Sequence, residues 1–189
     1  MTELCDLIRG NEWQYAIAHL QVLADSDAVD EIFYHGVFGT TFFYACDDRA
    51  PLELVQLMLT TAKLDSRKRN VVSINYRHDY TPFHGAAYSH DDPAVLELLI
   101  REYPLALCAI DYDGLTPLQE AYLAFHEERP HVLSLLADTT NALASGDFAV
   151  LAARVHGDSS AIRRLCPLSA FSPSRFAVRI ELLLCIKHG

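Results

Sequence analysis

Apolar residues recur at helical spacing in the central part of the chain, in segments that come in pairs. The second segment of each pair, Val95 to Ile100 or His131 to Leu136, follows a helix break at 90–93 or 127–130. Proline suits the first turn of a helix because it has no N–H to satisfy there. The first segment begins with Thr-Pro, at Thr81 or Thr116, and threonine is a good N-cap. The pattern predicts units made of a helix, a turn, a second helix and an extended loop.

Two of these units repeat each other. Residues 75–86 read Asn-Tyr-Arg-His-Asp-Tyr-Thr-Pro-Phe-His-Gly-Ala, and residues 111–121 read Asp-Tyr-Asp-Gly-Leu-Thr-Pro-Leu-Gln-Glu-Ala, so that the two threonines are 116 − 81 = 35 residues apart. Self-similarity at about 33 residues around a Thr-Pro-Leu-His core is typical of stacked helical repeats. The pair resembles the ankyrin repeat. The resemblance implies an all-α fold, an ankyrin-repeat solenoid of stacked helix-turn-helix repeats with hairpin loops, in a protein that binds something.

A degraded unit precedes this pair. Thr41-Phe42 aligns with Thr116-Pro117, with Phe42 in place of the proline, and Thr81 follows Thr41 by 81 − 41 = 40 residues. The residues beyond the period are assigned to the loop at 63–70. The predicted organisation is therefore N-terminal capping helices (1–37), a degenerate ankyrin repeat (38–72), two ankyrin repeats (73–107 and 108–140) and an irregular C-terminal helical repeat or cap (141–189).

The C-terminal segment Phe176–Ile186 is apolar on nearly every side, apart from Arg179 and Glu181. A helix of this kind is usually buried, whereas the last repeat of a solenoid should be polar outside. We expect another element to cover it: a following repeat, a second copy of the chain, or a partner. The alternative is that it packs under the Ser/Pro loop at 167–174 that precedes it.

Composition narrows the class of protein. Of the 189 residues 51% are hydrophobic, which is enough for a sizeable core, and the net charge of −10 disfavours nonspecific attraction to nucleic acid or anionic lipid. The five cysteines are widely spaced and form no Cys-x-x-Cys pair, which favours reduced thiols and a cytoplasmic or nuclear protein. No secretory signal is visible, and no apolar run reaches the roughly 20 residues that span a bilayer. The expected partner is another protein, with no nucleic acid and no membrane.

The family resemblance also implies a binding surface, built from the hairpin tips and the exposed positions of the first helices. Tyrosine and arginine dominate many binding surfaces, so Arg77, Tyr80, Tyr88 and Tyr112 stand out. One or two of the tyrosines would alternatively pack between repeats. The full set of expected partner-binding residues is Asn75, Arg77, His78, Tyr80, Tyr88, Ser89, Ile110, Tyr112, Asp113, Leu115 and Leu123, with Ala124 beside the last.

A basic loop is the sharpest electrostatic feature of this acidic chain. It contains Lys63, Arg67, Lys68 and Arg69. Such a run can dock an acidic or phosphorylated segment of a partner. The alternatives are a patch that resembles a nuclear-import signal and a solvated loop without a binding role.

The sequence gives little support for catalysis. His84 belongs to the repeat motif, where the resemblance implies that the imidazole bonds local backbone. His126 and His131 are five residues apart, which does not suit a metal pair on one helix face, and no catalytic motif appears. We expect no catalytic residue, metal or cofactor. Three functions compete: an interaction module, an assembly protein that self-associates through Phe176–Ile186, and an enzyme that uses Cys46, Cys108 or a histidine without supporting spacing.

Overall fold

The computed structural model describes residues 2–37, 39–67, 70–73, 79–125 and 129–155, which fold into helices and connecting loops without a β-strand in these ranges. The expected all-α class is confirmed. In chain order the elements are α1 (Glu3–Arg9), α2 (Trp13–Val22), α3 (Asp25–Ile32), α4 (Thr41–Asp47), α5 (Leu52–Ala62), η1 (Val71–Ser73), α6 (Pro82–Ser89), α7 (Pro93–Glu102), η2 (Pro104–Cys108), α8 (Pro117–Phe125), α9 (Pro130–Ser145) and α10 (Phe148–Arg154).

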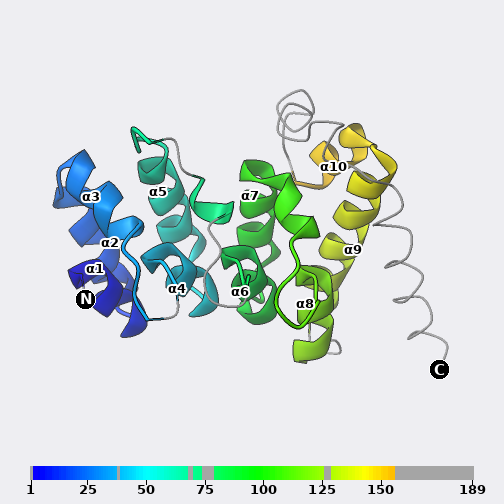
Figure 1. The fold of residues 1–189 in the computed structure, drawn as a ribbon, viewed down its shortest axis with the longest axis horizontal. Helices are drawn as coiled ribbons and strands as arrows, with labels where there is room; N and C mark the ends of the chain where they lie inside the picture. The colour runs from blue at the N-terminus through cyan, green and yellow to red at the C-terminus, as the bar shows by residue number, and fades with distance from the viewer. Residues whose placement is uncertain (1, 38, 68–69, 74–78, 126–128, 156–189) are drawn as a thin grey trace.

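The α-helices lie in two rows along the molecule (Figure 1). The first row consists of α1, α4, α6 and α8, which pack side by side in this order. The second row begins with α2 and α3 and continues through α5, α7 and α9, with α10 packed against α9. Each unit therefore contributes one helix to each row, and the surface of the first row is built from consecutive units.

The core fills the space between the two rows. Phe42 of α4 and Phe83 of α6 are completely buried, and so are Leu54, Leu99 and Leu136 of the second row. Burying a side chain of this size stabilises the fold by about 1.5–3 kcal/mol. The paired apolar segments of the sequence thus correspond to the facing sides of the two rows.

Two threonines cap the first-row helices α6 and α8 in the same way. The side chain of Thr81 accepts a hydrogen bond from the His84 backbone N–H at 3.3 Å, and the Thr81 N–H donates to His84 Nδ1 at 3.2 Å. Thr116 and Gln119 repeat both contacts, at 3.4 and 2.9 Å. This reciprocal arrangement is a capping box, which satisfies N–H groups that the first turn of a helix leaves unpaired.

The first unit is shifted by one residue from the alignment made on sequence. Its N-cap is Thr40, whose side chain accepts from the Phe43 N–H at 3.0 Å, and not Thr41. The distance from this cap to the N-cap of the second helix is 51 − 40 = 11 residues, and in the next unit it is 92 − 81 = 11. The match of Phe42 with proline was therefore wrong: Phe42 corresponds to Phe83, and both fill the core.

The N-terminal segment, where capping helices were expected, contains three helices, α1, α2 and α3. Its third helix, α3, begins with acidic residues but buries Ala28, Val29 and Ile32. The Glu31 carboxylate joins all three helices, because it accepts from the Leu4 N–H at 2.9 Å and lies 3.0 Å from His19 Nε2.

At the other end, α10 lies in the segment that was expected to form an irregular helical repeat or cap. Residues 156–189 lie outside the described part of the chain, so the prediction that another element covers Phe176–Ile186 stays a prediction. Among the described residues, no helix combines the length and the apolar character needed to cross a membrane.

Candidate functional site

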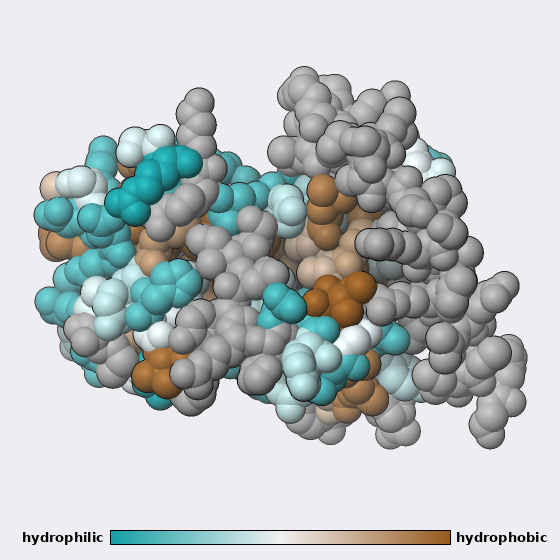
Figure 2. All heavy atoms as spheres, in the orientation of Figure 1, coloured by the Kyte–Doolittle hydropathy of each residue, from teal (hydrophilic) through white to brown (hydrophobic). Residues whose placement is uncertain are grey.

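Large apolar side chains are exposed on the first row and on the loop that precedes α8. Tyr112 is 75% exposed, Leu123 65%, Tyr88 44% and Ile110 41%. In the view of Figure 2, hydrophobic residues appear on the side of the molecule where α7 and α8 lie, while hydrophilic residues cover much of the side of α1 to α5. We call the surface formed by Asp47, Tyr88, Ile110, Tyr112, Asp113, Glu120 and Leu123 the first-row surface.

The loop that carries Tyr112 is held closed by backbone and side-chain contacts. The Asp111 N–H donates to the Leu115 carbonyl at 3.0 Å, and the Asp111 carboxylate accepts from the Leu115 N–H at 2.8 Å. Gly114 has φ +81°, a conformation that glycine adopts without strain. The Leu115 carbonyl also accepts from His84 Nε2 at 3.3 Å, which ties this loop to α6. Leu115 is half-buried, so its part in the site is to fix the loop rather than to offer a side chain.

Tyr80 packs between units, in agreement with the alternative that one or two of the tyrosines lie between repeats. Its ring centroid lies 6.0 Å from that of Phe43 in the preceding unit and 5.2 Å from that of His84. Burial raises the pKa of the Tyr80 hydroxyl, and the charges of Glu120, Asp47 and Asp111 raise it further. The residue before it in sequence, Asp79, has φ +59° and stands at the position that Gly114 holds in the next unit.

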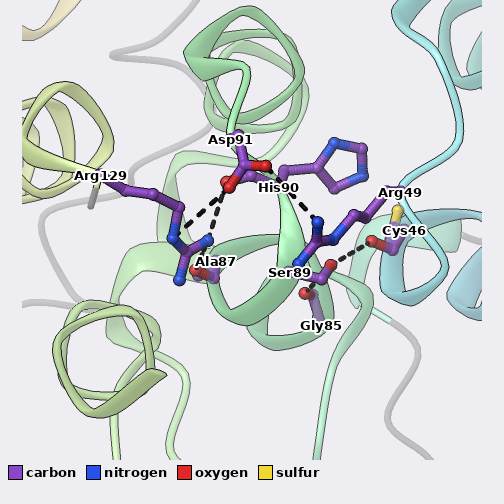
Figure 3. Close-up of polar contacts among 8 residues, drawn as sticks. All are labelled: Cys46, Arg49, Gly85, Ala87, Ser89, His90, Asp91 and Arg129. Atoms are coloured by element: carbon purple, nitrogen blue, oxygen red, sulfur yellow. Dashed lines mark hydrogen bonds and ion pairs between the residues drawn. The ribbon is translucent and has the colours of Figure 1, made fainter. Parts of the chain in front are cut away.

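Ser89 was expected at an exposed position, and this expectation was wrong. The residue is buried, and its hydroxyl contacts the carbonyl oxygens of Gly85 at 2.7 Å and Cys46 at 3.1 Å (Figure 3). The physical reason is the close approach of α4 and α6. A Cβ on Gly85 would lie 3.2 Å from the Cβ of Asp47. The absence of a side chain at Gly85 therefore lets the two helices approach closely.

Two acidic side chains of the first-row surface, Asp47 and Glu120, were not among the residues expected from the sequence. Burial raises the pKa of Glu120 to about 7, and a hydrogen bond with Asp111 and the charges of Asp111 and Asp113 add to this rise. The pKa of Asp47 is also raised, by burial and then by Asp48. In the corrected alignment Asp47 takes the position of Tyr88 and Leu123, since 47 − 40 and 88 − 81 are both 7. The one-residue misalignment had hidden this equivalence.

Several expected site residues lie outside the described part of the chain. They are Asn75, Arg77 and His78 of the second hairpin, and Lys68 and Arg69 of the basic loop. The two described residues of that loop pair with acidic residues of neighbouring helices. Lys63 Nζ lies 2.8 Å from Glu102 of α7, and Arg67 Nη2 lies 3.5 Å from Asp30 of α3.

A polar cluster joins the turns between the two rows (Figure 3). The buried Arg129 donates from Nη1 to the carbonyl oxygens of His90 at 2.9 Å and Ala87 at 3.4 Å. Asp91 lies between two guanidinium groups, 3.5 Å from Arg49 Nη1 and 3.7 Å from Arg129 Nε. Asp92 caps α7 by accepting from the Ala94 N–H at 2.9 Å. The cluster holds three successive turns together.

Two further features bear on catalysis and metal binding: the state of the Cys46 thiol and the grouping of metal-ligating side chains. Cys46 is completely buried, and burial followed by the charge of Asp47 raises the pKa of its thiol. A protonated thiol is a poor nucleophile. In the ranges that the structure describes, no three His, Cys, Asp or Glu side chains are grouped as a metal ion would require.

Comparisons with protein-family models, with curated proteins and with solved structures found no match. The residues of the first-row surface are therefore the basis on which a function is proposed.

Proposed function

We propose that the chain is an ankyrin-repeat solenoid that acts as a protein–protein interaction module. It binds a segment of a partner protein on the first-row surface and has no catalytic activity of its own. The repeated Thr-Pro units, the two rows of helices and the equivalent threonine caps of α4, α6 and α8 support the family. In such arrays each unit contacts its neighbours and leaves an extended side free for a partner.

The observation that carries the proposal is the exposure of Tyr88, Tyr112 and Leu123 on consecutive units. Large apolar side chains that gather on a surface mark interaction sites, and tyrosine is common among the residues that dominate binding. The capping boxes and the closed Asp111–Leu115 loop fix the backbone beneath these side chains. A fixed backbone lowers the entropic cost of binding.

The surface can be tested by affinity capture with two matched variants. The first carries Tyr88→Ala, Tyr112→Ala and Leu123→Ala. The control carries Tyr15→Ala and Val22→Ala on α2, where these side chains are 69% and 82% exposed. We expect the first variant to lose the proteins that the unmodified chain captures, and the control to retain them, with similar melting temperatures for both. Equal capture by all three chains would contradict the proposal.

A second proposal is self-association through Phe176–Ile186, favoured by the apolar character of this segment. Light scattering coupled to size-exclusion chromatography over a wide concentration range distinguishes the two. A mass that rises with concentration, and that Leu183→Glu returns to the monomer value, would support self-association. A constant monomer mass would leave the first-row surface as the place to seek a partner.

A further inference from the structure

We propose that the segment bound by the first-row surface is basic, and that its arginine side chains lie against the exposed tyrosines while pairing with the neighbouring carboxylates. This inference rests on the proposed function and adds the chemistry of the partner. It commits to a protein segment rich in arginine or lysine.

Acidic residues lie next to the exposed apolar residues of this surface, in the sequence or on the neighbouring helix. Tyr112 stands between Asp111 and Asp113 in the loop, and Leu123 is one turn from Glu120 on α8. On the neighbouring unit, Asp47 lies against α6 at Gly85, one turn before Tyr88. The carboxylates therefore border the apolar patch across consecutive units.

These carboxylates act on one another and on a common neighbour. Glu120, Asp47 and Asp111 all raise the pKa of Tyr80, and Tyr88 contributes as well, so the four groups lie within electrostatic range of one hydroxyl. Asp113 in turn acts on Glu120. Independent side chains from α4, α8 and the loop before α8 thus contribute to one region of negative potential.

In the described part of the chain, no ion pair reaches these carboxylates. The ion pairs between described residues involve none of Asp47, Asp111, Asp113 and Glu120. A basic side chain near the N-terminal edge, Arg9, is placed over the Tyr44 ring at 5.3 Å and acts on Asp48. The pKa of Glu120 is raised because its side chain is partly buried and because the like charges of Asp111 and Asp113 act on it. A cation brought by a partner would relieve this repulsion.

Arginine suits the mixture of tyrosine and carboxylate better than other side chains do. Its planar guanidinium stacks on an aromatic face and donates two parallel hydrogen bonds to a carboxylate. Tyr112 beside Asp113 offers both partners within one loop. An acidic partner would meet repulsion here, and a purely apolar one would bury these carboxylates without compensation.

The test is a selection of random peptides displayed on phage, with the full chain as the target. We expect the selected peptides to be enriched in arginine over lysine and to be depleted of acidic residues. Their affinity is then measured for two variants that each replace three carboxylates by amides. The first carries Asp47→Asn, Asp113→Asn and Glu120→Gln, and the control carries Asp25→Asn, Asp27→Asn and Glu53→Gln at exposed positions of α3 and α5.

Affinity should fall by at least roughly tenfold in the first variant and stay within about twofold in the control. An equal loss in both would reveal a general attraction to an acidic protein and overturn the inference, as would neutral or acidic peptides or no enrichment at all. If the first variant does not fold, Asp113→Lys at an exposed loop position takes its place, with the same expected loss. Capture that depends on Tyr88, Tyr112 and Leu123 but not on these carboxylates would leave the proposed function standing and reject the basic partner.

Discussion

Adjacent residues of α6 show how much a single position decides. Tyr88 is exposed and available to a partner, whereas Ser89 is buried and hydrogen-bonded to α4. The same applies in the next turn, where His90 is buried and Asp91 lies near the surface between two arginines. Successive residues of a helix point in directions about 100° apart. An alignment of repeats can therefore place a residue in the correct turn of the helix and still give the wrong exposure for its side chain.

The first residue-scale prediction concerns pH and His90. Burial lowers the pKa of this imidazole to about 4, although Asp92 and the Cys46 carbonyl act in the opposite direction. An unfolded histidine has a pKa near 6.5, so between these values the unfolded chain binds a proton that the folded chain does not. This group therefore makes no difference above about pH 7, and it destabilises the fold as pH falls from roughly 6.5 towards 4.

The measurement is urea unfolding at pH 7 and pH 5 for the unmodified chain and for His90→Gln. The unmodified chain should lose about 2 kcal/mol more of its unfolding free energy between the two pH values than the variant does. The same loss in both chains would show that His90 is not buried in its neutral form. An NMR titration of the His90 imidazole in the unmodified chain gives a check that does not depend on the variant.

At the scale of the element, each unit is defined by its caps and by the two faces that its helices bury. Thr81 and His84, and Thr116 with Gln119, close the first turns of α6 and α8. The first unit achieves the same cap with Thr40 and without the reciprocal bond, because Phe43 takes the place of His84. The first unit thus lacks the Thr-Pro motif and the reciprocal bond of the cap, but it has the helix and the buried Phe42.

The corrected position of this cap can be tested with two neighbouring threonines. Thr40→Val removes the oxygen that accepts from Phe43, whereas Thr41→Val keeps that cap and preserves the shape of the side chain. We expect Thr40→Val to lower the free energy of unfolding by about 1 kcal/mol and Thr41→Val to lower it by less. The reverse order in urea denaturation would restore the original alignment, in which Thr41 matches Thr81 and Thr116.

Much at this scale was predictable because it depends on local chemistry. The helix pairs follow from the Thr-Pro starts and the apolar spacing, and the α7 cap follows from Asp92 before Pro93. Features that depend on distant residues were not predictable. Helix α3 begins with acidic residues, which gave no sign of its three buried side chains. The hydrogen bond of Arg129 with His90 forms only because the turns before α7 and α9 lie side by side. The burial of Ser89 likewise requires the contact of α4 with α6.

At the scale of the molecule, two stacked rows of helices turn short local motifs into an extended surface. The positions of Asp47, Tyr88 and Leu123 are equivalent in successive units, and together they offer an acidic residue, an aromatic residue and an aliphatic one in line. Under the proposed function, a partner segment would contact these successive units one after another. The polar cluster of Arg49, Asp91 and Arg129 holds the turns in register on the same units.

Site-specific photo-cross-linking tests the central claim, that this surface is where a partner binds. A photoreactive phenylalanine derivative replaces Tyr112 or Tyr88 in the full chain, and in a control it replaces Tyr15 of α2, which is also exposed. The account predicts one common cross-linked protein from positions 112 and 88, and none of it from position 15. The same product from all three positions, or a partner reached only from position 15, would contradict it.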